Sequence, residues 1–415
     1  MQESVGYVPN EVGLVRHPFF TCLRASSASG PTQPGIRMPP KIIDLSKTDD
    51  LRDVVHLAVQ ALAESKAVVF QTETDYVVAV AARRDGVAQI GNLAVPRQGE
   101  PLLSLAVKSA DEALDWAPRL TGVAQRIARR CWPGPVTMLV ADDHPESLVH
   151  RLPADSRQAV VGDGRLRLRV PGHPLLRDCL KMLDGPVALA EPDPAGCGIA
   201  VTAQACVERC GDAGALVLDD GQTRYAQPST TIAADAEGFQ PVRPGVIAEE
   251  TVRRLASLMV LFVCTGNTCR SPMAEALFRD LVAKRLGCRP DEVESRGVVV
   301  ASAGIAAWAG GRASGNAVEA MEERGIDLTA HASQPLSDEL VQQADVIWTM
   351  TNSHRAAITS QFPEAAGRVA VLSPDRRDVL DPIGGPLPVY RECARQIHDH
   401  LAARLQTLDL GPRRG

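Results

Sequence analysis

Apolar runs alternate with amphipathic segments along most of the chain. Residues 50–65 have apolar positions three and four apart, which predicts a helix, and the apolar runs at 66–73 and 76–82 predict strands. The alternation returns in the last third, where an apolar run at 258–263 precedes a helical pattern at 271–287. Strands that alternate with helices are typical of α/β folds, so we expect a parallel sheet in each region.

The pattern divides the chain into three parts. Residues 1–39 are rich in Ser, Pro and Gly without sustained periodicity, and we expect a disordered lead there. Residues 40–249 are predicted to form a first domain and residues 258–410 a second, because 415 residues exceed what one hydrophobic core usually serves. A translation start at Met38 instead of Met1 is an open hypothesis.

Composition narrows the function classes. The formal net charge of -6 is mild and gives no reason to expect general binding to nucleic acid or to membranes. No apolar stretch reaches the length of a transmembrane helix, and the first residues lack the pattern of a secretory signal. The 10 cysteines are spread along the chain, which favours reduced thiols in the cytoplasm. Cys206 and Cys210 have helical spacing without further ligands nearby, so no metal site is predicted.

The sequence CTGNTCR at 264–270 lies between the predicted strand and the predicted helix. Main-chain amides of a tight loop at a helix N-terminus converge and favour a phosphate-sized dianion. The loop lacks the Lys-Ser/Thr end of a nucleotide-binding P-loop and has Cys264 where the strand ends. We therefore expect Cys264 to be a thiolate nucleophile for phosphoryl transfer, and Arg270 to hold two phosphate oxygens with its planar fork. The alternative is a buried cysteine at a strand end.

Phosphoryl transfer also needs a proton for the leaving group. Asp381, followed by a proline near the end of the chain, is the predicted general acid. Loops at the carboxyl ends of parallel strands gather at one edge of a doubly wound sheet, so this distant loop can reach the phosphate. The alternative is an ordinary Asp-Pro surface turn. Ser271 is expected to donate a hydrogen bond to the sulfur, and Asn267 to adopt a left-handed backbone.

These motifs resemble the low-molecular-weight protein tyrosine phosphatase family over residues of about 260 to 405. VLFVCTGNTCRSPMAEALF matches that family's signature, LDPIGG matches its acid loop, and ASAGI matches the segment whose serine braces the loop asparagine. The resemblance implies a phosphocysteine on Cys264, transition-state stabilisation by Arg270, and Asp381 as acid and then base. It also implies phosphorylated proteins as substrates and no metal or other cofactor. The residues that bind phosphate or support the loop are then Thr265, Gly266, Asn267, Thr268, Cys269, Ser271 and Ser302.

The kind of phosphoresidue depends on a few positions. Thr268 is polar where tyrosine-specific members usually carry an aliphatic residue, which resembles the bacterial protein-arginine phosphatase branch. Ile383 departs from that branch, which tends to have an aromatic residue after its Asp-Pro. Trp308 is expected to supply the missing aromatic wall, and its alternative is a half-buried surface tryptophan. Phosphoarginine is preferred, and phosphotyrosine stays open.

Residues of about 41–249 resemble the YrdC/Sua5 family, which makes threonylcarbamoyl-AMP from threonine, bicarbonate and ATP for tRNA modification. VVFQTETDY, CWPGPVTMLV, RLRVPGHP, PSTTIAAD and VRPGVI match in family order. The resemblance implies an open twisted α/β sheet around a concave basic cleft that can bind ATP. The positions that match cleft residues are Thr72, Thr74, Arg97, Arg169, Ser229 and Arg243.

Several positions depart from that family's pattern. Gln71 replaces a proline, the lysine of a Lys-x-Arg pair is missing, and Glu191-Pro192-Asp193 replaces Ser-Ala-Asn. The loss of a cation and the gain of anions lower affinity for a triphosphate, so we expect a degenerate domain without synthase activity. One alternative is a bifunctional enzyme with L-threonylcarbamoyladenylate synthase activity. Another is a domain that binds a nucleotide or RNA, including double-stranded RNA.

Overall fold

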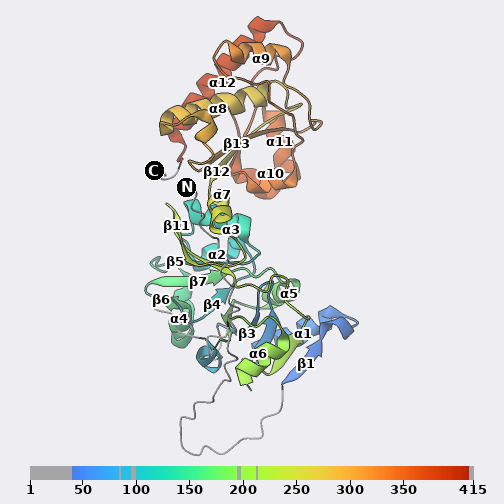
Figure 1. Ribbon diagram of the computed structural model, residues 1–415, viewed down its shortest axis with the longest axis vertical. Helices are drawn as coiled ribbons and strands as arrows, with labels where there is room; N and C mark the ends of the chain where they lie inside the picture. The colour runs from blue at the N-terminus through green and yellow to red at the C-terminus, as the bar shows by residue number, and fades with distance from the viewer. Residues whose placement is uncertain (1–39, 84–85, 95–99, 194–197, 212–213, 411–415) are drawn as a thin grey trace, which may run out of the picture. The chain divides into compact units, whose positions relative to one another are not determined.

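A computed structural model describes residues 40–83, 86–94, 100–193, 198–211 and 214–410. The expected disorder of residues 1–39 and the predicted cleft position of Arg97 lie outside the described residues. Within them, the chain forms one large mixed sheet and one smaller parallel sheet (Figure 1).

The first sheet has the strand order β1-β9-β2-β3-β8-β4-β7-β5-β10-β11, with β6 paired to β7. Its strands are β1 (Lys41–Asp44), β2 (Val68–Gln71), β3 (Tyr76–Ala81), β4 (Ser104–Ala106), β5 (Val136–Ala141), β6 (Val161–Gly162), β7 (Arg165–Arg169), β8 (Val187–Ala190), β9 (Leu216–Asp219), β10 (Thr230–Ala234) and β11 (Phe239–Arg243). The helices of this region are α1 (Leu51–Ala63), α2 (Ala110–Trp116), α3 (Gly122–Cys131), α4 (Ala154–Val160), α5 (Pro174–Met182), α6 (Ala203–Cys210) and α7 (Glu249–Leu255).

The expectation of a parallel sheet is wrong for this first region. Neighbours such as β2 and β3, β3 and β8, and β5 and β7 run antiparallel, whereas β1 and β9 run parallel. Only residues 72–75 connect β2 to β3, and so short a connection forms a hairpin instead of the crossover that parallel neighbours require. The sheet is therefore mixed, and the α/β class is confirmed.

Strand β7 shows why the alternating sequence RLRLR matters. Leu166 and Leu168 are buried in the main hydrophobic core of the region. Arg167 and Arg169 project to the opposite face, because successive side chains of a strand point to opposite sides. Both arginines are nevertheless buried, which means that their charges must meet partners inside the domain.

The second sheet is parallel and has the order β13-β12-β14-β15. Its strands are β12 (Leu258–Cys264), β13 (Val298–Gly304), β14 (Val346–Thr349) and β15 (Val369–Val371), and its helices are α8 (Arg270–Leu286), α9 (Gly315–Glu322), α10 (Asp338–Gln343), α11 (Asn352–Gln361) and α12 (Leu387–Thr407). All seven residues of β12 are buried, as expected for a central strand covered on both faces.

Helices cover both faces of this parallel sheet (Figure 1). Val260 and Phe262 pack in one core with residues of α8, α9 and α12, whereas Leu261 and Val263 pack in a second core with residues of α10 and α11. The predicted doubly wound arrangement is confirmed. Helix α8 ends at Gly287, whose φ of 68° is the left-handed conformation that commonly terminates helices.

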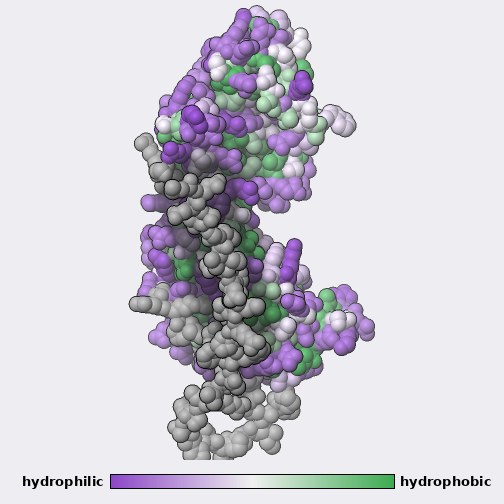
Figure 2. Space-filling view, viewed as in Figure 1, coloured by the Kyte–Doolittle hydropathy of each residue, from purple (hydrophilic) through white to green (hydrophobic). Residues whose placement is uncertain are grey.

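Hydrophilic residues cover most of the described surface on the face that Figure 2 shows. In the described ranges, no helix combines the length and the apolar character that crossing a bilayer requires.

Candidate active site

The predicted nucleophile lies at the carboxyl end of the central strand β12. Cys264 is the last residue of that strand, and α8 begins six residues later at Arg270. Its Sγ lies 3.0 Å from Oγ of Ser271, and the main-chain amide of Asn267 donates to the sulfur at 3.2 Å. The sulfur thus lies within hydrogen-bond distance of a main-chain amide and a hydroxyl, close to the N-terminus of α8.

Asn267 fixes the shape of the loop. Its φ of 53° is left-handed, as the sequence predicts. Its Nδ2 donates to Oγ of Ser271 at 2.9 Å and to Oγ of Ser302 at 2.8 Å. Ser302, on β13, donates in turn to Oε2 of Glu275 at 2.7 Å. These bonds connect the loop to α8 and to the neighbouring strand, so the loop is shaped before any ligand arrives.

Three residues that the sequence did not indicate hold the loop from outside. Nε2 of His331 lies 2.8 Å from the main-chain oxygen of Asn267, and the amide of Gln334 donates to Oδ1 of Asn267 at 2.9 Å. Nε2 of His354 lies 2.9 Å from Oγ1 of Thr265. Each comes from a segment more than 60 residues away, and no local spacing marks it.

His354 is buried below the loop, at the start of α11. Its Nδ1 lies 2.8 Å from Oγ1 of Thr351, so both ring nitrogens have hydroxyl partners. Burial lowers the pKa of His354 below its ordinary value, and the positive charge of Arg270 lowers this pKa further. The neutral imidazole is therefore favoured beside the loop.

The predicted clamp and the predicted acid meet in the structure. Nη2 of Arg270 forms an ion pair with Oδ2 of Asp381, and its Nη1 donates to the main-chain oxygen of Val379 at 3.1 Å. The side chain of Arg270 is only 5% exposed, whereas that of Asp381 is 39% exposed. Arg270 is thus fixed in the loop, and its counterion lies on the surface.

Gly304, at the end of β13, allows the loop to pack closely. A Cβ at this position would lie 2.5 Å from the main-chain oxygen of Thr265 and 2.9 Å from the amide of Asn267. Because these are backbone atoms with no freedom to move aside, only glycine fits here.

The other residues predicted for the loop and the substrate pocket differ in their exposure to solvent. Thr268 is half-buried in the loop, and Cys269 is buried, with its Sγ 3.3 Å from Oγ of Ser314. Trp308 and Ile383, the predicted substrate-pocket residues, are 89% and 68% exposed. Neither packs into the core, so both side chains present apolar surface to solvent.

The predicted cleft residues of the first region form two groups. Thr72, Thr74 and Arg169 make up one group, in which Nη2 of Arg169 donates to Oγ1 of Thr74 at 2.8 Å. Arg243 and Ser229 make up the other, with Nη2 of Arg243 3.1 Å from Oγ of Ser229.

Acidic partners compensate the arginines of this cleft. Arg169 pairs with Glu73 at 3.0 Å, and Arg243 pairs with Glu191 at 2.7 Å. Arg167 also pairs with Glu191, at 3.1 Å. The described part of the cleft is therefore charge-balanced and not basic, because the departure from the family at Glu191 supplies an internal counterion.

Comparison with known proteins agrees with the geometry of the second domain. Residues 259–411 match the family model described as low molecular weight phosphotyrosine protein phosphatase, and residues 60–245 match the Sua5, YciO and YrdC family model, described as telomere recombination. A protein-arginine-phosphatase of Bacillus subtilis is 41% identical over 146 residues, which are 34% of this chain and 91% of that protein.

Two further relatives are similar over the same region. A probable low molecular weight protein-tyrosine-phosphatase, EpsP, of Ralstonia nicotianae is 37% identical, over 33% of this chain and 87% of that protein. A crystal structure of a YwlE mutant from Bacillus subtilis is 40% identical and covers 36% of this chain and 100% of that chain, with a TM-score of 0.32.

The fold, the loop and these relatives define a protein phosphatase. The chain belongs to the low molecular weight phosphotyrosine protein phosphatase family, which confirms the resemblance seen in the sequence. The match of residues 60–245 confirms the second resemblance, to the Sua5/YrdC family.

Proposed function

We propose that the second domain removes phosphate from arginine residues of proteins through a phosphocysteine intermediate. The observation that supports this most directly is the constellation around Cys264, whose sulfur accepts a main-chain amide of the loop while the Arg270–Asp381 pair stands at the helix start. One nucleophile, one fixed cation and one acid are what transfer of a phosphoryl group to sulfur and back to water requires.

The reaction proceeds in two balanced steps. In the first, the Cys264 thiolate attacks phosphorus, the bond between phosphorus and the guanidino nitrogen breaks, and Asp381 gives its proton to that nitrogen. In the second, Asp381 takes a proton from water, and the resulting hydroxide attacks the phosphorus of phosphocysteine. The bond between sulfur and phosphorus breaks, which releases phosphate and restores the Cys264 thiolate. Arg270 exchanges its carboxylate partner for phosphate oxygens in both transition states.

Two features support phosphoarginine as the substrate. Thr268 places a hydroxyl in the half-buried wall of the loop, where a planar guanidinium can hydrogen-bond and a phenol ring gains little. Asp381 pairs with the guanidinium of Arg270 in the structure. When Arg270 turns to the phosphate oxygens, the same carboxylate can pair with the guanidinium of the substrate. Phosphotyrosine is the second candidate, because Trp308 and Ile383 expose apolar surface suited to a phenol ring.

Turnover of phosphoarginine and phosphotyrosine peptides by the wild type and by Thr268→Ile tests the substrate. We expect Thr268→Ile to lose phosphoarginine turnover and to keep phosphotyrosine turnover. Absence of phosphoarginine turnover by the wild type would end this proposal, and continued phosphotyrosine turnover would then assign the second candidate. We expect neither activity to need a metal or other cofactor, so addition of a chelator should leave both rates unchanged.

We further propose that the first domain lacks synthase activity, because Glu191 engages the guanidinium groups of Arg167 and Arg243. Conversion of ATP to AMP that depends on threonine and bicarbonate would refute this. RNA binding that survives Cys264→Ser and fails when Arg169 is replaced would instead favour a nucleic-acid-binding domain.

A thiolate nucleophile also suits a reducing compartment, so we place the protein in the cytoplasm.

A further inference from the structure

Two cysteines that the phosphatase mechanism does not use lie side by side in the first domain. Cys206 and Cys210 are one turn apart on α6, and their Sγ atoms are separated by 3.6 Å. Both are free thiols, and both are buried, with Cys206 0% and Cys210 7% exposed. A reaction at one sulfur therefore has a second thiol within hydrogen-bond distance.

The backbone of α6 allows the two sulfurs to bond to each other. Residues four apart in an α-helix are separated by about 6 Å along its axis, and disulfides span Cα distances of this size. The sulfurs must approach from 3.6 Å to the bond length of about 2.0 Å. Cys210 is the last residue of α6, and Gly211 after it has a φ of 57°. No further helical turn restrains the turn that must close.

The two thiols differ in reactivity. The hydrogen bond with Cys206 lowers the pKa of the Cys210 thiol, and the positive charge of Arg209 lowers this pKa further, although burial opposes both. The same hydrogen bond raises the pKa of the Cys206 thiol, and burial raises it further. Because the thiolate is the nucleophile, the slightly more exposed Cys210 is favoured as the sulfur that attacks an oxidant first.

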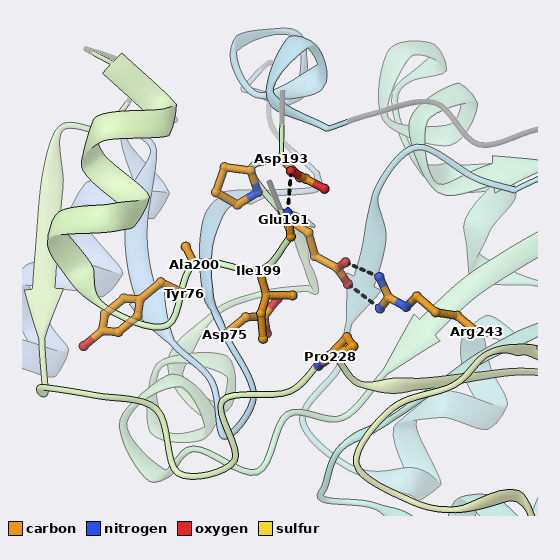
Figure 3. Close-up of a pocket in the computed structure, with 10 residues that line it drawn as sticks. Asp75, Tyr76, Glu191, Asp193, Ile199, Ala200, Pro228 and Arg243 are labelled. Atoms are coloured by element: carbon orange, nitrogen blue, oxygen red, sulfur yellow. Dashed lines mark hydrogen bonds and ion pairs between the residues drawn. The ribbon is translucent and has the colours of Figure 1, made fainter. Parts of the chain in front are cut away.

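Helix α6 also holds the wall of a cavity of about 290 Å³, which Figure 3 shows. Arg209 lies between the two cysteines in the sequence and donates to the main-chain oxygens of Pro192 and Gly198. Both of these residues line the cavity. Cys206 and Cys210 themselves pack in the main hydrophobic core of the first domain. A modification of this pair therefore takes place beside the cavity of the first domain and not at the phosphatase loop.

A zinc ion would need more ligands than the two cysteines supply. Zinc sites in proteins use at least three protein ligands. Within the ranges that the structure describes, no group of three or more side chains that could hold a metal ion comes together. Oxidation to a disulfide, by contrast, needs only the two sulfurs and an oxidant.

We propose that Cys206 and Cys210 form a dithiol that hydrogen peroxide oxidises to a disulfide within the last turn of α6. In the first step, the Cys210 thiolate attacks a peroxide oxygen, a sulfur–oxygen bond forms, the oxygen–oxygen bond breaks, and the released hydroxide takes up a proton to give water. In the second step, the sulfur of Cys206 attacks the sulfur of the Cys210 sulfenic acid. The sulfur–sulfur bond forms, and the hydroxyl group leaves as water with the proton of Cys206. The two sulfurs lose two electrons in total, which reduce one peroxide to water. This inference does not depend on the function proposed for the phosphatase domain.

Peptide mapping of the full chain tests the proposal. After treatment with hydrogen peroxide, the protein is denatured, the remaining thiols are blocked, and trypsin cuts after Arg209, which separates residues 182–209 from residues 210–224. We expect these two peptides to be joined by a disulfide that dithiothreitol cleaves, and fragmentation to place the bond on Cys206. Two separate peptides, at a peroxide dose that oxidises Cys264, would overturn the proposal.

Variants identify the two reacting sulfurs. Cys206→Ser should lose the joined peptides and leave Cys210 oxidised beyond sulfenic acid, because no second thiol captures it. Cys179→Ser is the matched control, since it removes an equally buried cysteine of the same domain and should keep the joined peptides. Joined peptides that persist in Cys206→Ser would assign the partner to Cys197, which lies on the same tryptic peptide, and would overturn the proposal. The wild-type map decides the question even where a serine variant fails to fold.

Discussion

Each of the two domains buries guanidinium groups beside carboxylates, but only one of them leaves a guanidinium ready for an anion. In the phosphatase loop, Arg270 is 5% exposed and its partner Asp381 is 39% exposed on a surface loop. In the first domain, Arg167 is equally buried, and its partner Glu191 is only 17% exposed and also binds Arg243. The number of arginines in a cleft therefore says less about anion binding than the freedom of their counterions to move away.

Main-chain groups sharpen the contrast. The phosphatase loop adds amides at the N-terminus of α8, of which the amide of Asn267 already donates to the Cys264 sulfur. These amides carry positive potential that no side chain can neutralise. The first-domain cleft relies on side chains, and an acidic substitution there is enough to cancel them.

Among the changes that distinguish the two domains, loss of the nucleophile is expected to have the largest effect, and it acts on phosphatase turnover. Cys264→Ser should lower phosphatase turnover by about ten-thousandfold or more, because a serine hydroxyl is a far weaker nucleophile than a thiolate. Cys288→Ser, a half-buried cysteine just beyond α8, should keep full turnover. Steady-state kinetics on one phosphopeptide measure both variants, and an active Cys264→Ser protein would show that the loop is not the reaction centre.

Removal of the counterions should have the next largest effect, and it should lower the stability of the two domains by different amounts. Glu191→Ala removes the carboxylate that the buried Arg167 and the half-buried Arg243 share, and should lower the free energy of unfolding of the first domain by about 3 to 5 kcal/mol. Asp381→Ala removes an exposed partner and should cost the second domain less than about 1 kcal/mol. Hydrogen exchange resolved by domain measures each value, and equal costs would erase the distinction between a fixed and a displaceable counterion.

Replacement of an arginine by lysine should change phosphatase kinetics in the second domain but not in the first. Arg270→Lys keeps the charge but loses the planar fork, so kcat/KM should fall by about a hundredfold, the typical cost of one transition-state donor. Arg243→Lys, the matched change in the first domain, should leave phosphatase kinetics unchanged. A dependence of turnover on Arg243 would mean that the two sites are coupled.

The smallest expected effect concerns pH. His354 has a lowered pKa in the folded protein and is surrounded by Arg270, Asp381 and Asp378. Its contribution to stability is full above the ordinary pKa of 6.5 and falls below it, because the unfolded chain takes up the proton first. His354→Gln should flatten this dependence, whose slope is at most about 1.4 kcal/mol per pH unit. Urea unfolding between pH 5 and pH 8 (about one to two units either side of the ordinary value) measures it, and an unchanged slope would assign the dependence to another group.

The sequence pattern predicts those features of the site that depend on residues close together in the chain. The strand–loop–helix at Cys264 and the left-handed Asn267 follow from adjacent residues, so the sequence was sufficient for them. His331 and His354 support the loop from 64 and 89 residues away, and only the folded chain brings them there. Likewise, the sequence shows that Glu191 departs from the Sua5/YrdC family pattern, but the pairing of Glu191 with Arg167 depends on how distant strands align.

The exposure of Trp308 has a practical consequence. The chain has 4 tryptophans, of which Trp116, Trp132 and Trp348 are buried, whereas Trp308 is 89% exposed. Trp308 follows Ala306, whose amide donates to the main-chain oxygen of Thr265. A soluble quencher such as iodide should therefore reduce the emission of one tryptophan selectively, and the segment that carries it is hydrogen-bonded to the catalytic loop through Ala306. Iodide quenching of the unlabelled protein therefore reports on solvent access at this one position.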